Sequence, residues 1–410
     1  MSGLATTASV LLPVEKGGTN RYELAAPREW AKPSAPFTVR KAYAAAHVIP
    51  LVGADNTPGS PADLDWESTL AFRHELWSYG LGVADAMDTA QRGMGLDWAA
   101  TRELIARVGA EARTVAASGT RATSGLTVRD LVACGAGTDQ LELAAVHDGP
   151  RGVAMALEAY REQLATVEDA GPKVILMASR ALARAASSAD DYLNVYSKLL
   201  AEAREPVVLH WLGTMFDPAL EGYWGSADVP TATRTFLDLI RSHADKIDGV
   251  KVSLLDAEHE KALRAELPAG VRLYTGDDFN YPELINGDGE HHSDALLGIF
   301  AAIYPAASAA LQAYEAGKAS EGRGILDSTR DLGLHIFSAP TFYYKTGIAF
   351  LSWLNGQQPG FQMVGGLHSG RSVQHLAQVF RLADCAGLLR SPDVAAARMA
   401  SFLDVNGVAQ

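Results

Sequence analysis

The stretch IDGVKVSLLD, residues 247–256, places a lysine inside an otherwise apolar strand. Successive side chains of a strand point to opposite faces, so one face is apolar and is formed by Val250, Val252 and Leu254. Lys251 lies on the second face, between the small residues Gly249 and Ser253. One amine therefore projects from a face that is otherwise small and polar.

Seven further apolar runs accompany this one, and amphipathic stretches separate them. In residues 97–112 and 188–203 the apolar side chains recur every three or four positions, which predicts helices. We expect eight strands, at residues 44–53, 80–88, 112–120, 172–180, 205–213, 248–256, 270–278 and 295–303. Eight strand–helix units in one domain predict an α/β fold, the (β/α)8 or TIM barrel, rather than an open sheet.

The barrel occupies residues 36–310 in this prediction. Residues 1–35 are rich in proline and charge, which predicts an irregular N-terminal extension or a short hairpin. Residues 311–410 have a mostly helical pattern without a flexible linker, so we expect a C-terminal helical appendix that packs on the barrel. The segment between the third and fourth expected strands, residues 121–170, is too long to be one helix. We expect TVRDLVACGAG (127–137) within it to form an added helix or a partial strand pair.

The composition favours a soluble protein with a small-molecule partner. The 410 residues are 48% hydrophobic and carry a formal net charge of −13. A chain of this length can bury a full core, and the negative charge disfavours nucleic acid and membrane surfaces as partners. No apolar run approaches the roughly 18 residues of a membrane span, and the N-terminus has no export signal. The two cysteines, Cys134 and Cys385, have no metal-site spacing and indicate a cytoplasmic location.

Polar side chains at the carboxyl ends of the expected strands are the first candidates for a site, because active sites of such barrels gather there. They are His47, Asp85, Asp88, Thr89, Ser118, Thr120, Ser179, Arg180, His210, Trp211, Lys251, Ser253, Asp277 and Asp278. Burial of the Lys251 ammonium would lower its pKa and leave a neutral amine able to attack a carbonyl group. The alternatives are an amine paired with a carboxylate inside the barrel and an amine in solvent.

The same segment resembles the dihydrodipicolinate synthase and N-acetylneuraminate lyase superfamily. The Gly-x-Lys of the family's sixth strand corresponds to Gly249 and Lys251, and the similarity continues through GDD at 276–278, Gly298 and TFYYKTGIAFLSWLNG at 341–356. These enzymes are class I aldolases on a (β/α)8 barrel, so the resemblance implies that Lys251 forms a Schiff base. It also implies a carbonyl substrate (a 2-oxo acid or keto-sugar), a carbon–carbon or carbon–oxygen lyase reaction without a cofactor, and a homodimer or homotetramer.

Two segments depart from the family pattern, which is clearest over residues 170–356. Where the family's fourth strand ends in a relay tyrosine, this chain reads MASRALARAA, with Ser179 or Arg180 at the approximate place. The loop that binds a carboxylate in the family reads MDTAQRG, which keeps Thr89 and adds Asp88. Arg180 is a candidate for binding an anionic substituent, because a guanidinium suits a carboxylate.

We assign three further residues to the substrate side of the expected site. Ser253 would hold or protonate the substrate together with Asp88 and Thr89. His210 stands where the family often has a tyrosine, and it is either a proton donor or a histidine that fills the barrel mouth. Asp277 either binds a hydroxylated substrate or orients groups at the end of its strand.

Two other functions stay open at this level. Asp85, Asp88, His210 and Asp277 are residue types that bind a divalent cation, which would give a metal-dependent aldolase or sugar isomerase with Lys251 as a base. A non-catalytic ligand-binding barrel is the other alternative.

The aromatic run FYY at residues 342–344 invites a stacking or proton-relay role, but it is expected to pack, because consecutive aromatic residues at the start of a helix usually fill gaps between helix and barrel. We therefore assign it no part in the chemistry.

Overall fold

The computed structural model describes residues 8–14 and 17–410, and eight parallel strands close into a barrel. The strands follow one another around the barrel in chain order, and the last pairs with the first. They are β3 (Ala42–Ala45), β4 (Gly82–Asp85), β5 (Val132–Ala136), β6 (Lys173–Leu176), β7 (Val207–Leu212), β8 (Ile247–Ser253), β9 (Arg272–Thr275) and β10 (Asp294–Leu297). The (β/α)8 barrel predicted from the sequence is confirmed.

The third strand is β5, and the prediction for it was wrong. Residues 112–120 lie almost entirely in helix α2 (Trp98–Ser118), whose apolar side chains recur at helical spacing and are buried at Leu104, Ile105, Val108, Ala112 and Val115. The segment 127–137 instead forms the single-turn helix α3 (Val128–Leu131) and β5 itself. Because α2 runs back from the carboxyl ends of the strands, Ser118 and Thr120 lie at the opposite end of the barrel from the expected site.

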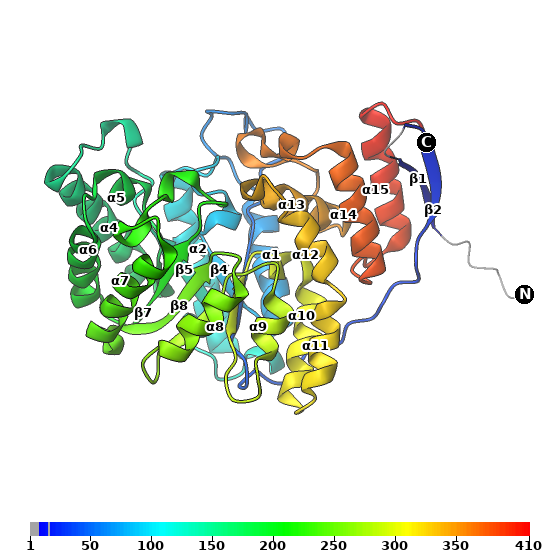
Figure 1. Cartoon of the computed structure of the whole chain (residues 1–410). Helices are drawn as coiled ribbons and strands as arrows, with labels where there is room; N and C mark the ends of the chain where they lie inside the picture. The colour runs from blue at the N-terminus through cyan, green and yellow to red at the C-terminus, as the bar shows by residue number, and fades with distance from the viewer. Residues whose placement is uncertain (1–7, 15–16) are drawn as a thin grey trace, which may run out of the picture.

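Helices that follow the strands form the outer layer of the barrel (Figure 1). Besides α2 and α3 they are α1 (Trp66–Ser78), α4 (Pro150–Ala170), α5 (Arg180–Ala185), α6 (Ala189–Glu202), α7 (Val229–Ser242), α8 (Ala257–Glu266), α9 (Tyr281–Asn286) and α10 (Phe300–Glu315). Aspartates cap several of them; Asp65, for example, accepts a hydrogen bond from the backbone N–H of Ser68 and starts α1. No described helix has the length and apolar character needed to cross a membrane.

Apolar side chains fill the interior of the barrel, and ion pairs close its amino-terminal end. The interior cluster consists of Tyr43, Ala45, Ala84, Met87, Ala133, Ile175, Met177, Val208, Tyr274 and Leu296. Below it Lys173 pairs with Asp248 at 2.9 Å and Arg272 with Asp294 at 3.0 Å. The barrel is therefore a packed core, and space for a ligand is left at the other end.

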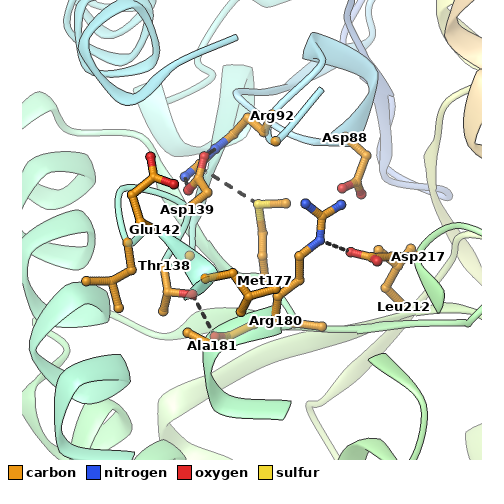
Figure 2. Close-up of a pocket in the computed structure, with 16 residues that line it drawn as sticks. Asp88, Arg92, Thr138, Asp139, Glu142, Met177, Arg180, Ala181, Leu212 and Asp217 are labelled. Carbon is orange, nitrogen blue, oxygen red and sulfur yellow. Dashed lines mark hydrogen bonds and ion pairs between the residues drawn. The ribbon is translucent and has the colours of Figure 1, made fainter. Parts of the chain in front are cut away.

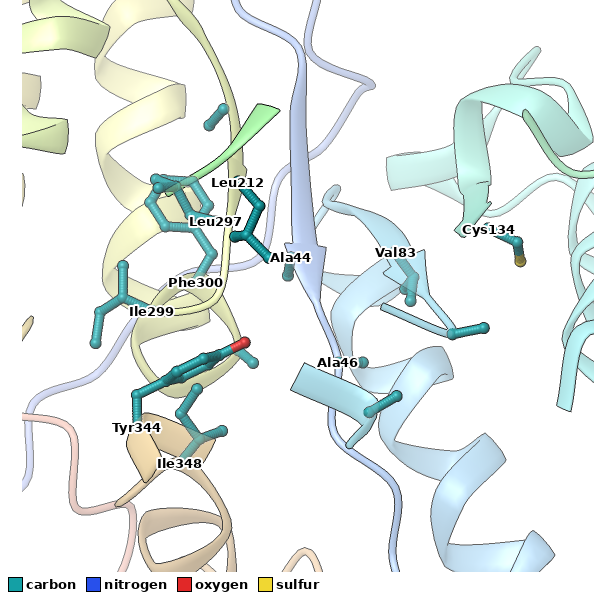
Figure 3. Close-up of a cluster of buried hydrophobic side chains, with 14 of the residues drawn as sticks. Ala44, Ala46, Val83, Cys134, Leu212, Leu297, Ile299, Phe300, Tyr344 and Ile348 are labelled. Carbon is teal, nitrogen blue, oxygen red and sulfur yellow. The ribbon is translucent and has the colours of Figure 1, made fainter. Parts of the chain in front are cut away.

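A second, larger cluster joins the barrel to the helices, and part of it is drawn in Figure 3. It includes Val83 on the outer face of β4, Phe300 of α10, and Ile348 of the C-terminal helix α13 (Tyr344–Leu354). The C-terminal helices thus share one continuous apolar core with the barrel.

The C-terminal region is helical, as expected, and the N-terminal hairpin packs on it (Figure 1). Besides α13 it contains α11 (Ala319–Asp327), α12 (Arg330–Ile336), α14 (Val373–Cys385) and α15 (Pro392–Val405). The hairpin pairs β1 (Ser9–Pro13) with β2 (Thr19–Glu23), and the hydroxyl of Tyr22 donates to Asp384 of α14 at 2.8 Å. Of the predicted extension, residues 1–7 and 15–16 lie outside the described part.

The expected boundary between barrel and appendix, at residue 310, falls within α10. The division of the chain into three parts stays a prediction.

Candidate active site

Lys251 lies on the inner face of β8, level with His210 of β7 and Tyr274 of β9. Its side chain is buried, with 7% of the residue exposed. No carboxylate of the described residues lies within 4.0 Å of the amine. Burial lowers the pKa of Lys251, and the more distant charges of Asp88 and Asp278 oppose that shift. The amine thus lies neither in bulk solvent nor in a direct ion pair.

Asp278 is the carboxyl group from the seventh-strand loop that faces Lys251. One of its oxygens accepts a hydrogen bond of 2.7 Å from the backbone N–H of Ile299. Burial raises the pKa of Asp278 to about 8, although the charge of Lys251 acts in the opposite direction. Desolvation thus acts against the charged form of both groups, lowering the pKa of Lys251 and raising that of Asp278.

The carboxylate of Asp277 is bonded within its own loop, whereas a substrate ligand would have an oxygen free to face the site. Its Oδ1 accepts hydrogen bonds from the backbone N–H groups of Phe279 and Asn280, both at 2.9 Å, and its Oδ2 accepts one from the Asn280 amide. These bonds engage both oxygens and shape the loop that carries Asp278. The structure therefore favours the orienting role among the two that the sequence left open for Asp277.

His210 and Ser253 lie together beside Lys251 on the inner face of the barrel. Nε2 of His210 is 3.2 Å from Oγ of Ser253, whereas Nδ1 of His210 has no partner in the described chain. Burial, and after it the charge of Lys251, lowers the pKa of His210 well below its ordinary value, so the imidazole is neutral. A side chain at Gly276 would place its Cβ 2.1 Å from Oγ of Ser253, so glycine is required there to leave room for these groups.

Asp88 and Thr89 form a 3-10 turn after β4, and Thr89 contacts the C-terminal region. The hydroxyls of Thr89 and Tyr344 share a hydrogen bond of 2.8 Å. Tyr344 begins α13, and its ring stacks on Phe337 at a centroid distance of 4.3 Å. Burial, together with the charge of Asp88, holds the pKa of Tyr344 well above its ordinary value. The aromatic run thus packs as expected, but one of its hydroxyls also reaches the site.

Lys345, the next residue of α13, is a second buried amine near Asp88. Only 2% of the residue is exposed, and its Nζ has one hydrogen-bonding neighbour in the described chain, Sδ of Met94 at 3.2 Å. Burial lowers the pKa of Lys345 to about 8, with Asp88 and Asp217 opposing the shift and Arg180 adding to it.

A cavity of about 280 Å³ opens at the carboxyl ends of β5, β6 and β7 (Figure 2). Asp88 and Arg180 both line it, and Nε of Arg180 donates to Asp217. The two terminal nitrogens of Arg180 point toward Asp88 in Figure 2 and make no hydrogen bond within the described chain. The carboxylate of Asp88 likewise accepts no hydrogen bond from the described residues. A carboxylate without a donor, and a guanidinium whose terminal nitrogens have no acceptor, are typical of a binding site when they line a cavity.

Comparison with known proteins places the chain in a family. Residues 10–408 match the family described as "Protein of unknown function (DUF993)". The chain belongs to the DUF993 family. No curated protein matches its sequence.

Solved structures of the dihydrodipicolinate synthase family share the fold of this DUF993 protein. The synthase of Aquifex aeolicus is 12% identical, with a TM-score of 0.58 over 85% of this chain and 99% of the other. YagE, a prophage protein of Escherichia coli solved in complex with pyruvate, is 14% identical, with a TM-score of 0.59 over 85% and 99%. The 4-hydroxy-tetrahydrodipicolinate synthase of Methylacidiphilum fumariolicum SolV is 15% identical, with a TM-score of 0.59 over 85% and 96%. At these identities the similarity shows the fold alone.

The four residues of the metal-binding alternative do not form one ligand set in the DUF993 chain. Asp85 forms two hydrogen bonds with Arg73, of 2.8 and 2.9 Å, on the outer side of the barrel. Asp277 is engaged by its own loop, as described above. Among the described residues, no three His, Cys, Asp or Glu side chains are grouped as metal ligands.

Of the residues expected from the sequence, the structure gathers Lys251, His210, Ser253, Asp88 and Thr89 near the mouth of the barrel, with Arg180 on the adjoining cavity. Sequence reasoning missed Tyr344 and Lys345. The signal available for Lys345 was the one used for Lys251, a lysine inside an apolar run, here YYKTGIAFLSWL.

Proposed function

We propose that this DUF993 protein is a lyase of the dihydrodipicolinate synthase type, in which Lys251 forms a Schiff base with a carbonyl compound, either a 2-oxo acid or a keto-sugar. One observation carries the proposal: Lys251 is a buried amine without a direct ionic partner among the described residues, and it faces Asp278, whose pKa burial raises. A structural lysine in the same barrel looks different, because Lys173 is equally buried but bound to Asp248 at 2.9 Å.

The proposed reaction begins when the neutral amine of Lys251 attacks the carbonyl carbon. A carbon–nitrogen bond forms and the carbonyl oxygen leaves as water. In the direction of carbon–carbon cleavage, the bond between the α and β carbons then breaks and its electron pair passes to the iminium, which becomes an enamine. The hydroxyl on the β carbon gives its proton to a base, and that fragment leaves as an aldehyde. The enamine is then protonated at carbon, and hydrolysis restores the amine and releases the product. This sequence needs no metal or cofactor.

The groups around Lys251 supply the protons in this proposal. Asp278, whose pKa burial raises to about 8, donates a proton to the departing water. The hydroxyl pair of Tyr344 and Thr89, next to Asp88, exchanges protons with the enamine. Ser253, with the neutral His210 behind it, holds the substrate.

Borohydride trapping tests the proposal. The protein is incubated with pyruvate and with a panel of keto-sugars, reduced, digested and mapped by mass spectrometry. We expect an adduct on the peptide of Lys251, no adduct on Lys173, and loss of the adduct in Lys251→Met. An adduct confined to other lysines, or a carbonyl ligand that binds without any adduct, contradicts the Schiff base. Binding that survives Lys251→Met without any turnover in the wild type would favour a ligand-binding barrel.

A further inference from the structure

The cavity at the carboxyl ends of β5, β6 and β7 holds an acceptor and a set of donors that face each other without contact. Asp88 and Arg180 both line the cavity, and the terminal nitrogens of Arg180 point toward Asp88 in Figure 2. No ion pair within 4.0 Å joins the two side chains, and neither the carboxylate nor these nitrogens have a hydrogen-bond partner in the described chain. A space therefore separates a strong acceptor from strong donors.

A hydroxyl is the group that fits between a carboxylate and a guanidinium. Its proton donates to the carboxylate and its oxygen accepts from the guanidinium, so one neutral partner satisfies both charged groups. An anionic group in the same place would accept from Arg180 but would face Asp88 with a charge of the same sign, and an ammonium would face Arg180 in the same way. The two side chains together thus favour an uncharged hydroxyl over either ion.

The other charges of the cavity lining also act against an anion. Each guanidinium of the lining already pairs with a carboxylate of the lining. The buried amine of Lys345 faces Asp88 from α13 without lining the cavity, and the carboxylates still outnumber the cations when it is counted. A phosphate or a further carboxylate would therefore enter a negatively charged cavity. The charged side chains of the lining are the four carboxylates of Asp88, Asp139, Glu142 and Asp217 and the two guanidiniums of Arg92 and Arg180.

The rest of the cavity suits a chain of hydroxylated carbons. The hydroxyls of Thr138 and Ser179, both buried, share a hydrogen bond of 2.6 Å, and Oγ of Ser179 also accepts one from the backbone N–H of Leu182. The pair has two hydroxyl protons for one mutual bond, so one proton is left for a ligand oxygen. At about 30 Å³ for each water-sized group, 280 Å³ accommodates a short chain. Its carbon atoms can pack on the apolar part of the lining, formed by Leu141, Leu143, Met177 and Leu212.

Two residues connect this cavity with Lys251. Asp88 lines the cavity, and its charge acts on the amine of Lys251. Leu212, at the end of β7, also lines the cavity, and it pairs in register with Ser253 of β8, two residues beyond Lys251. The far end of a substrate bound to Lys251 can therefore enter the cavity.

We propose that the cavity binds an uncharged, polyhydroxylated chain of the substrate, and that one of its hydroxyls donates to Asp88 and accepts from Arg180. This inference rests on the proposed function, because it names the substrate class of the same site: a hydroxylated carbonyl compound without a phosphate or a carboxylate at the end away from Lys251. It differs from the anionic substituent that the sequence suggests for Arg180, because Asp217 pairs with that guanidinium and Asp88 faces it.

Saturation-transfer NMR with polyols that lack a carbonyl group tests this inference. Glycerol, erythritol, ribitol and sorbitol are titrated, and the best binder is compared with its terminal phosphate ester. We expect at least one polyol to bind the wild type, and its ester to bind at least about 10-fold more weakly, because the ester adds charge of the same sign as the lining. No binding of any polyol, or an ester that binds as tightly as the polyol, overturns the inference.

The Asp88→Asn variant distinguishes recognition by Asp88 from a role in folding. Loss of the charge should weaken polyol binding about 10-fold, since a charge-assisted hydrogen bond is lost, and should strengthen binding of the ester, since repulsion is relieved. A damaged fold would weaken both, and parallel changes of the two affinities contradict the inference. Glu103→Gln, which removes a carboxylate from the exposed surface of α2, is the matched control and should leave both affinities unchanged.

The same probes separate this inference from the Schiff base, because none of them can react with an amine. Polyol binding that persists in Lys251→Met while trapping fails in the wild type would leave the polyol cavity in place and remove the Schiff base. An adduct on Lys251, together with an ester that binds as tightly as the polyol, would leave the Schiff base and overturn the polyol cavity.

A crystal of the wild type soaked with the best polyol covers the case in which Asp88→Asn does not fold. The inference predicts one ligand oxygen within hydrogen-bond distance of both Asp88 and Arg180. A polyol that binds elsewhere, or that lies in the cavity without contact to Asp88, contradicts it.

Discussion

The pH dependence of imine formation depends on two buried groups, Lys251 and Asp278. The pKa of Lys251 is lowered by burial, so the neutral amine becomes available as the pH rises through that lowered value. The pKa of Asp278 is raised to about 8, so the proton it donates is lost as the pH rises through about 8. We therefore expect the trapping rate with pyruvate to rise on the acid side and to fall above about pH 8.

The Asp278→Asn variant is the control for the alkaline side, because an amide does not ionise. The trapping rate of this variant should be lower than that of the wild type at every pH, and it should not fall above about pH 8. A wild-type rate that keeps rising to pH 10, or a variant with the same fall, would show that Asp278 is not the acid.

Tyr344 gives a second prediction for a single side chain. Removal of its hydroxyl in Tyr344→Phe should lower the turnover rate about 100-fold or more, because a group that transfers protons is lost. The stability should change by only about 1 kcal/mol, since one hydrogen bond to Thr89 disappears. The neighbouring Tyr343→Phe is a matched control, and its rate should be unchanged. Equal rates in both variants would leave Tyr344 a packing residue.

The position of Lys251 within an apolar strand pattern singles it out, but that pattern leaves a paired amine and an amine in solvent open, and the family resemblance decides between them. The sequence was not sufficient for Tyr344. The contact with Thr89 joins residues 255 positions apart, and local pattern assigns consecutive aromatic residues to packing. Asp277 and Asp278 show the same limit, because only the three-dimensional loop decides which carboxyl faces the amine.

At the scale of elements, one buried ion pair fixes helix α1 to strand β4. Arg73 and Asp85 are both fully buried, and Arg73 also donates to the backbone carbonyl of His47 at 2.6 Å. Asp85→Asn leaves the guanidinium without its counter-charge, and we expect a loss of about 3 to 5 kcal/mol in the free energy of unfolding. Urea denaturation measures this loss.

The exposed pair of Arg107 and Glu103 is the matched control, because it joins residues four positions apart on the surface of α2. Glu103→Gln should cost about 0.5 kcal/mol or less. Similar losses in the two variants would mean that the buried pair does not hold α1 in place.

Helices and strands could be predicted where the spacing of apolar residues matched one of the two periods. They could not be predicted where the spacing fitted both. Residues 112–120 contain Val, Ala and Thr in a short run, which resembles a strand, yet Ala112 and Val115 continue the buried stripe of α2. The true strand VACGA is short and follows the one-turn helix α3 directly. Residues 112–120 are therefore helical because they continue the buried face of α2, although their composition alone favours a strand.

At the scale of the whole molecule, the N-terminal hairpin contributes to the stability of the C-terminal helices. Leu12 of β1 is fully buried in the larger apolar cluster. Leu12→Ala should therefore lower the free energy of unfolding by about 2 to 5 kcal/mol, whereas Val405→Ala, at a side chain 82% exposed, should change it by less than about 0.5 kcal/mol. A small effect at Leu12 would mean that the hairpin is dispensable.

The overall architecture could be predicted by counting strand–helix units and from the family resemblance. The contact between the N-terminal hairpin and the C-terminal helices could not. Nothing in the local pattern around Tyr22 points to Asp384, 362 positions away, and the two meet only because α14 folds back beside the hairpin. The same folding brings α13 over the barrel mouth and adds Tyr344 and Lys345 to the site.

A crystal structure of the protein soaked with pyruvate tests the central claim most directly. The account predicts continuous electron density between Nζ of Lys251 and the carbonyl carbon, with the new bond inside the barrel mouth beside Asp278. A ligand seated at the same mouth with its carbonyl intact, and the amine of Lys251 bound instead to a carboxylate of the protein, would contradict it.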